Sequence, residues 1–127
     1  MPRGGSETIL LVDDEDRVRA LGSRILTKAG YTVISGSNGR EGLQLYEEHS
    51  DDIGLVILDL IMPVMDGKKC LAELLKKNPA LKVLVASGHS ANGRGSEALA
   101  AGARGFIDKP YDMRQLREVV RAVLDAD

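Results

Sequence analysis

Four short apolar runs in this sequence each lead into residues that could do chemistry. Two runs lead to carboxylates, one leads to a hydroxyl and one leads to an ammonium group. In chain order, Asp13 and Asp14 follow residues 9–12, Asp59 follows 55–58, Ser87 follows 83–86, and Lys109 lies just beyond 105–107. Each has an ordinary explanation alone, because Asp caps helices and Ser and Lys are common in loops. Their recurrence after successive apolar runs favours a shared site.

This combination of groups suits the transfer of a phosphoryl group. Carboxylates gathered in one place repel one another, and Mg²⁺ relieves that repulsion while keeping positions open for phosphate oxygens. One carboxylate can then attack phosphorus and become an aspartyl phosphate. A lysine would neutralise charge on the phosphoryl group, and a hydroxyl could hydrogen-bond to it. Asp59 is the predicted nucleophile because it ends the most apolar run, where an unpaired charge would be costly.

The apolar runs are predicted to be strands of one parallel sheet. They are rich in Val, Leu and Ile and are continuous rather than alternating, as in strands covered on both faces. A further strand is predicted at 32–34, and helices are predicted at 18–29, 38–49, 70–77, 97–101 and 116–124. Five repetitions of strand and helix predict an α/β fold with a doubly wound five-stranded parallel sheet. Ligands of such folds bind beyond the carboxyl ends of the strands.

Composition limits the class of protein. The 127 residues suit one domain, and the 43% hydrophobic and 28% charged content is that of a globular protein. A net charge of −2 gives no basis for binding nucleic acid or a membrane. The single cysteine, Cys70, fits a reducing, cytoplasmic setting. Residues 1–6 are expected to be a disordered lead-in or a fragment boundary, and 7–127 a single domain.

Four segments together resemble the receiver domains of two-component response regulators. They are ILLVDDE (9–15), LVILDLIMPVMDG (55–67), VLVASG (83–88) and AGARGFIDKP (101–110). The resemblance extends from Glu7 to the C-terminus and implies the flavodoxin-like fold with strand order 2-1-3-4-5. The segments GGSETILLVDDE and SGHSANGRGSEALAAGARGFIDKPY also resemble C-terminal receivers of hybrid sensor histidine kinases. A stand-alone response regulator is the alternative.

The resemblance implies a role for each acidic residue. Asp59 would accept a phosphoryl group from a histidine of a kinase or a histidine phosphotransfer domain. Mg²⁺ or Mn²⁺ would be bound directly by Asp14 and Asp59, and through water by Asp13. The backbone carbonyl of Ile61 would be the remaining protein ligand.

The resemblance also implies a conformational switch. Ser87 and Lys109 would bind the phosphoryl oxygens, and Phe106 would move inward when Ser87 is drawn toward the phosphate. The peptide bond between Lys109 and Pro110 would be cis, which directs the lysine into the site. Ile61 and His89 would flank the phosphate and tune how fast it is lost. Such a domain, taken alone, promotes only its own phosphorylation and dephosphorylation, whereas a parent chain could be a kinase anchored in a membrane.

Other classes agree less well with the sequence. A phosphatase that forms an aspartyl phosphate with Mg²⁺ normally has a second Asp two residues after the nucleophile, and Ile61 stands there instead. A flavin-binding protein would need aromatic-rich loops, and this chain has four aromatic residues. A receiver that only binds partners would not need the set of Asp14, Asp59, Ser87 and Lys109. The fourth and fifth predicted helices offer a surface for a homodimer or a partner.

Overall fold

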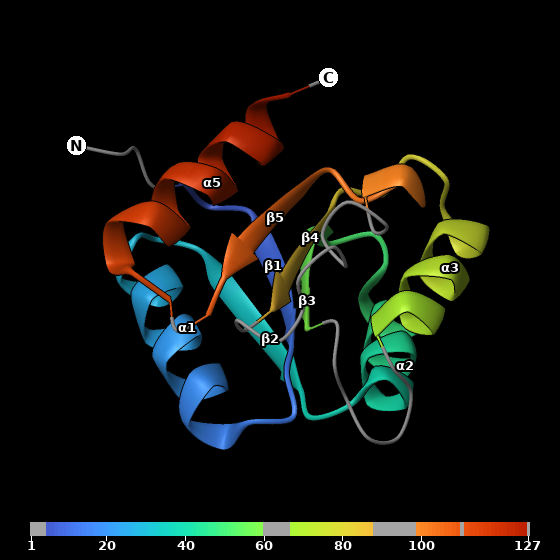
Figure 1. Ribbon diagram of the computed structural model, residues 1–127, viewed down its shortest axis with the longest axis horizontal. Coiled ribbons are helices and arrows are strands. Elements are labelled where there is room, and N and C mark those ends of the chain that lie inside the picture. The colour runs from blue at the N-terminus through green and yellow to red at the C-terminus, as the bar shows by residue number, and fades with distance from the viewer. Residues whose placement is uncertain (1–4, 60–66, 88–98, 110, 127) are drawn as a thin grey trace.

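The computed structural model describes residues 5–59, 67–87, 99–109 and 111–126 (Figure 1). Its five strands form one parallel sheet in the order β2-β1-β3-β4-β5, which confirms the predicted fold class. The strands are β1 (Thr8–Val12), β2 (Thr32–Gly36), β3 (Ile53–Asp59), β4 (Val83–Ser87) and β5 (Gly105–Asp108). The helices are α1 (Asp16–Lys28), α2 (Gly39–His49), α3 (Gly67–Lys77) and α5 (Met113–Asp125).

Local sequence signals explain where several helices begin and end. The Asn38 side chain accepts a hydrogen bond from the Glu41 backbone N–H at 2.9 Å, so it caps α2 as predicted. After α1, Gly30 takes a φ of 103°, a left-handed conformation that glycine adopts without strain. In the predicted helix at 97–101, Leu99 and Ala100 are helical, while residues 97 and 98 lie outside the described part of the chain.

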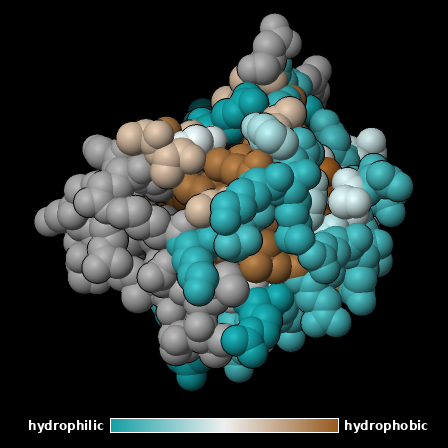
Figure 2. All heavy atoms as spheres, turned by 90° about the vertical axis from the view of Figure 1, so that its right-hand side faces the viewer, coloured by the Kyte–Doolittle hydropathy of each residue, from teal (hydrophilic) through white to brown (hydrophobic). Residues whose placement is uncertain are grey.

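Helices cover both faces of the sheet, so the core has two halves. Along β1, Leu10 and Val12 face the side of α2 and α3, whereas Ile9 and Leu11 face the side of α1 and α5. Residues 9–12 are at most 1% exposed, as expected for a central parallel strand. Seen from the α2 and α3 side, the surface of the described residues is largely hydrophilic, with apolar side chains visible between the polar ones (Figure 2). Successive side chains of β1 therefore alternate between the two halves of the core, one under α2 and α3 and the other under α1 and α5.

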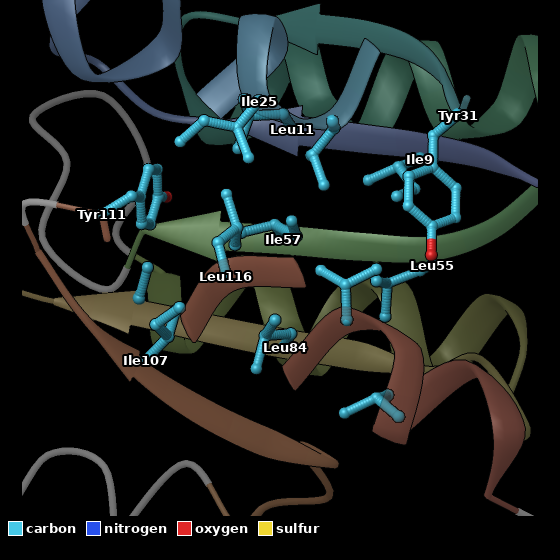
Figure 3. Close-up of a cluster of buried hydrophobic side chains, with 14 residues drawn as sticks. Ile9, Leu11, Ile25, Tyr31, Leu55, Ile57, Leu84, Ile107, Tyr111 and Leu116 are labelled. Carbon is cyan, nitrogen blue, oxygen red and sulfur yellow. The ribbon is translucent and has the colours of Figure 1, made fainter. Parts of the chain in front are cut away.

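Near the carboxyl end of β3, a buried tyrosine closes the α1/α5 half of the core. Tyr111 lies in the same cluster as Ile25 of α1 and Ile57 of β3 (Figure 3). A Cβ on Gly22 would come within 3.1 Å of the Tyr111 ring, so glycine there lets α1 approach closely. The Tyr111 hydroxyl is buried and has no hydrogen-bond partner among the described residues.

Replacing this tyrosine by phenylalanine should therefore stabilise the fold. We expect Tyr111→Phe to raise the free energy of unfolding by about 1 kcal/mol, because an unsatisfied buried polar group is removed. Tyr46→Phe is the matched control: its hydroxyl accepts a hydrogen bond from Asn78 Nδ2 at 3.2 Å, so its loss should lower the same quantity by about 1 kcal/mol. Urea denaturation of both variants measures the effect. A lower free energy of unfolding for Tyr111→Phe than for the wild type would show that the Tyr111 hydroxyl does have a hydrogen-bond partner.

Among the described residues, no helix is long and apolar enough to cross a bilayer. At the N-terminus, the Gly5 backbone N–H donates to the Ala29 carbonyl at 3.1 Å, so this contact belongs to the folded unit. The boundary between a lead-in at 1–6 and a domain at 7–127 stays a prediction.

Candidate functional site

Three strands carry the predicted polar residues to one end of the sheet. Asp13 comes directly after β1, Asp59 is the last residue of β3, and Lys109 comes directly after β5. The Lys109 Nζ lies 3.2 Å from Asp13 Oδ2 and 3.2 Å from Asp59 Oδ2. Residues 96 and 50 positions apart along the chain are thus brought into contact. The site forms where the sequence predicted it, beyond the carboxyl ends of the parallel strands.

Burial makes these charges strongly interdependent. The side chains of Asp13 and Asp59 are 0% and 3% exposed, and that of Lys109 is 9% exposed. Burial raises the pKa of the Asp13 carboxyl, although the Glu15 N–H and the Lys109 ammonium oppose that shift. Burial also disfavours the charged form of Lys109, but hydrogen bonding and the neighbouring carboxylates outweigh it, so its pKa is raised. Lys109 therefore remains an ammonium group at neutral pH.

The site contains one carboxylate to which the sequence assigned no role. Glu15 Oε1 lies 3.0 Å from the Lys109 Nζ, closer than either aspartate. Glu15 directly follows the acidic pair, which is the only signal in the sequence that could have drawn attention to it. With Asp13, Asp14 and Asp59, it offers ligand atoms that all lie within 4.8 Å of one another. Asp14 is exposed and Asp59 is buried, so the cluster opens to solvent on one side.

Backbone contacts hold the loop that carries these acids. The Asp13 N–H donates to the Gly36 carbonyl of β2 at 3.1 Å, and Asp13 Oδ1 accepts from the Glu15 N–H at 2.9 Å. Arg19 of α1 donates through Nη1 to the Asp13 carbonyl at 2.7 Å. The Asp13 backbone is therefore tied to β2 and to α1.

The predicted switch residues are described only in part. Ser87 ends β4, next to Ala86, whose register partner on β3 is Asp59. The backbone thus places Ser87 near Asp59, the predicted nucleophile, although the Ser87 side chain lies outside the described atoms. Phe106 is half-buried and packs against the α2/α3 half of the core. Ile61, His89 and Pro110 lie outside the described residues, so their predicted roles stay predictions.

Comparison with known proteins assigns this architecture to a family. Residues 9–121 match the family model described as the response regulator receiver domain. The chain belongs to this family. Receiver domains bind Mg²⁺ at an acidic pocket and interact with kinases or phosphotransfer partners. In this chain, a cluster of four acidic side chains lies beside Lys109.

Relatives of this receiver domain include both parts of larger proteins and small stand-alone proteins. It is 39% identical to the sensor kinase CckA of Brucella abortus, in an alignment of 121 residues that covers 95% of this chain and 13% of the relative. It is 37% identical to the chemotaxis protein CheY of Thermotoga maritima, in an alignment of 116 residues that covers 91% of this chain and 95% of the relative. The chain therefore spans about an eighth of the length of one relative and nearly all of the other.

Solved structures show the same fold. The receiver domain of NtrX from Brucella abortus aligns with a TM-score of 0.88 at 30% identity, over 94% of this chain and 99% of that one. A chain of the CheX–CheY–BeF₃–Mg²⁺ complex from Borrelia burgdorferi aligns with a TM-score of 0.89 at 29% identity, over 94% of this chain and 90% of that one. The fold of this chain is therefore that of a solved receiver domain, in agreement with the family to which its sequence belongs.

Proposed function

We propose that this receiver domain accepts a phosphoryl group on Asp59 from a phosphohistidine of a kinase or a phosphotransfer domain. The observation that carries the proposal is the Lys109 ammonium, 3.2 Å from Asp59 Oδ2 beside an acidic pocket. An Asp59 oxygen attacks phosphorus and forms a P–O bond, while the P–N bond of phosphohistidine breaks and the imidazole nitrogen keeps the electron pair. Lys109 favours the ionised carboxylate that this attack requires and neutralises charge on the phosphoryl oxygens.

The residues present fit a divalent cation. Four carboxylates within 4.8 Å of one another outnumber the single ammonium group, and oxygen donors are what Mg²⁺ or Mn²⁺ prefers. In the proposed site, Asp14 and Asp59 would hold the ion directly and Asp13 would hold it through water, with the Ile61 carbonyl as a further ligand. When bound, the ion would neutralise charge on the phosphoryl group. The similar fold of CheY in a complex with BeF₃ and Mg²⁺ supports this proposal.

The proposed output is a conformational change that begins at the phosphoryl group. Ser87 and Lys109 bind phosphoryl oxygens, and Phe106 packs more deeply as β4 and β5 adjust. The register of these strands, in which Val85 pairs with Phe106, supports such coupling because a shift in one strand moves the other. We propose that Pro110 follows a cis bond, and that Ile61 and His89 tune the lifetime of the phosphate.

The setting of the domain is also a proposal. Similarity to the CckA sensor kinase supports a receiver within a hybrid kinase, and similarity to CheY over nearly its full length supports a stand-alone regulator. A cytoplasmic location agrees with a sequence that has a single cysteine, Cys70, whose side chain is buried. A homodimer through the fourth and fifth helices is a further proposal.

The proposal predicts phosphorylation that depends on Mg²⁺. Incubation with acetyl phosphate and Mg²⁺ should add the mass of one phosphoryl group, and a chelator should prevent it. Asp14→Asn should weaken Mg²⁺ binding about tenfold or more, because a charged ligand is lost. Asp51→Asn, which removes an exposed carboxylate at the far end of the sheet, is the matched control and should bind Mg²⁺ normally. Mass spectrometry measures phosphorylation, and calorimetric titration measures Mg²⁺ binding. Equal phosphorylation with and without Mg²⁺ would contradict the proposal.

A further inference from the structure

The side chain of Glu15 is not used by the helix that it precedes. Glu15 is the N-cap residue of α1, with φ −89° and ψ 112°, yet its side chain makes no capping hydrogen bond. Short polar side chains such as Ser, Asp and Asn are the usual caps, because they reach the free N–H groups of the first turn. Glu15 instead places Oε1 at 3.0 Å from the Lys109 Nζ. The partner of this side chain is therefore in the phosphoacceptor site.

Among the described residues, three carboxylates contact the Lys109 ammonium. An ammonium group has three N–H donors. Its three carboxylate neighbours are Glu15 Oε1 at 3.0 Å, Asp13 Oδ2 at 3.2 Å and Asp59 Oδ2 at 3.2 Å. Phosphorylation turns the Asp59 carboxylate into an acyl phosphate, so a phosphoryl oxygen on Asp59 competes with the two remaining carboxylates, Asp13 and Glu15, for this ammonium.

Of these two carboxylates, Glu15 is the one that can leave more easily. Its side chain is 58% exposed, whereas that of Asp13 is 0% exposed. Water can replace the lysine around an exposed carboxylate, so that ion pair contributes little. A buried carboxylate that loses its cation is left uncompensated at a much higher cost. Asp13 is further held by the Glu15 N–H at 2.9 Å.

We infer that Glu15 is a positioning residue that competes with the phosphoryl group for Lys109. In the unphosphorylated domain its carboxylate holds the ammonium, and it moves into solvent when a phosphoryl oxygen takes its place. When the phosphate is lost, Glu15 binds the ammonium again. Glu15 thus favours the unphosphorylated state, and the competition is reciprocal because both groups need the same donor. This inference rests on the proposed function.

The inference can be tested with beryllofluoride as the probe, bound to the full chain. Affinity is measured by NMR titration at a Mg²⁺ concentration that saturates each variant. We expect Glu15→Gln to bind the probe about twofold to fivefold more tightly than the wild type, the size expected for losing one exposed ion pair. Asp16→Asn is the matched control, because Asp16 is 87% exposed and pairs with Arg19 rather than Lys109. It removes the same charge from the same turn and should bind like the wild type.

A double variant separates direct contact from a general effect of charge. If Glu15 acts through Lys109, then Glu15→Gln should give no further gain in a Lys109→Ala background. The inference is overturned if Glu15→Gln binds no more tightly than Asp16→Asn, or if its gain persists without Lys109. A wild-type chain that fails to bind beryllofluoride at all overturns the proposed function and the inference with it. Wild-type binding with no gain in Glu15→Gln overturns the inference alone.

Discussion

Asp59→Asn is expected to abolish phosphorylation while leaving the domain folded. The amide of asparagine is a far weaker nucleophile than a carboxylate, so no acyl phosphate forms. The Asn oxygen can still accept the hydrogen bond that Lys109 donates to Asp59 Oδ2 at 3.2 Å. Because three carboxylates surround one ammonium group, removing one negative charge relieves repulsion at Asp13 and Glu15. We therefore expect the free energy of unfolding to fall by no more than about 1 kcal/mol.

Two measurements check this result together. Mass spectrometry after incubation with acetyl phosphate reports phosphorylation, and urea denaturation reports stability. Asp52→Asn serves as a matched control, because Asp52 is an exposed aspartate that precedes β3 at the opposite end of the sheet. It should take up phosphate like the wild type. A phosphoryl group found on folded Asp59→Asn would place the acceptor elsewhere in the chain.

The fold was predictable because its main signals are local. The apolar runs at 9–12, 55–58 and 83–86 all lie within strands, and each is completely or almost completely buried. The ends of strands were less predictable. β2 continues through Ser35 and Gly36, two residues that give no hydrophobic signal. Strand order depends on contacts between distant residues, and it followed from the resemblance rather than from periodicity.

The site was predictable only as far as the positions of its residues. Asp13, Asp59 and Lys109 meet because parallel strands bring their carboxyl ends to one edge, and this follows from the fold class alone. The direction of the Glu15 side chain follows from the dihedral angles of the turn between β1 and α1, and the sequence does not contain them. For the same reason, the contact of Arg19 with the Asp13 carbonyl could not be foreseen. The sequence therefore predicted that Lys109 lies at Asp59, but it did not predict the contacts that Glu15 and Arg19 make in the site.

Lys109→Ala is expected to destabilise the domain when no divalent cation is present. The buried carboxylates of Asp13 and Asp59 would lose the ammonium that they share, and breaking a buried ion pair from one side typically costs about 3–5 kcal/mol. Mg²⁺ should restore more stability to this variant than to the wild type, because the ion supplies the missing positive charge. Urea denaturation with and without Mg²⁺ measures both effects. Lys82→Ala is the matched control: the Lys82 Nζ donates to the Leu124 carbonyl at 2.6 Å, away from the acidic cluster.

The same variant should separate phosphorylation from its structural consequence. Asp59 remains in place, so Lys109→Ala should still become phosphorylated, at a reduced rate because one positive charge no longer stabilises the transferring group. The phosphoryl group would then have no contact with the end of β5, which carries Phe106 three residues before Lys109. Beryllofluoride should therefore shift the NMR signals of Phe106 in the wild type and in Lys82→Ala, but not in Lys109→Ala. Wild-type shifts at Phe106 in Lys109→Ala would mean that the signal reaches β5 by another route, with β4 and the pairing of Val85 with Phe106 as the remaining connection.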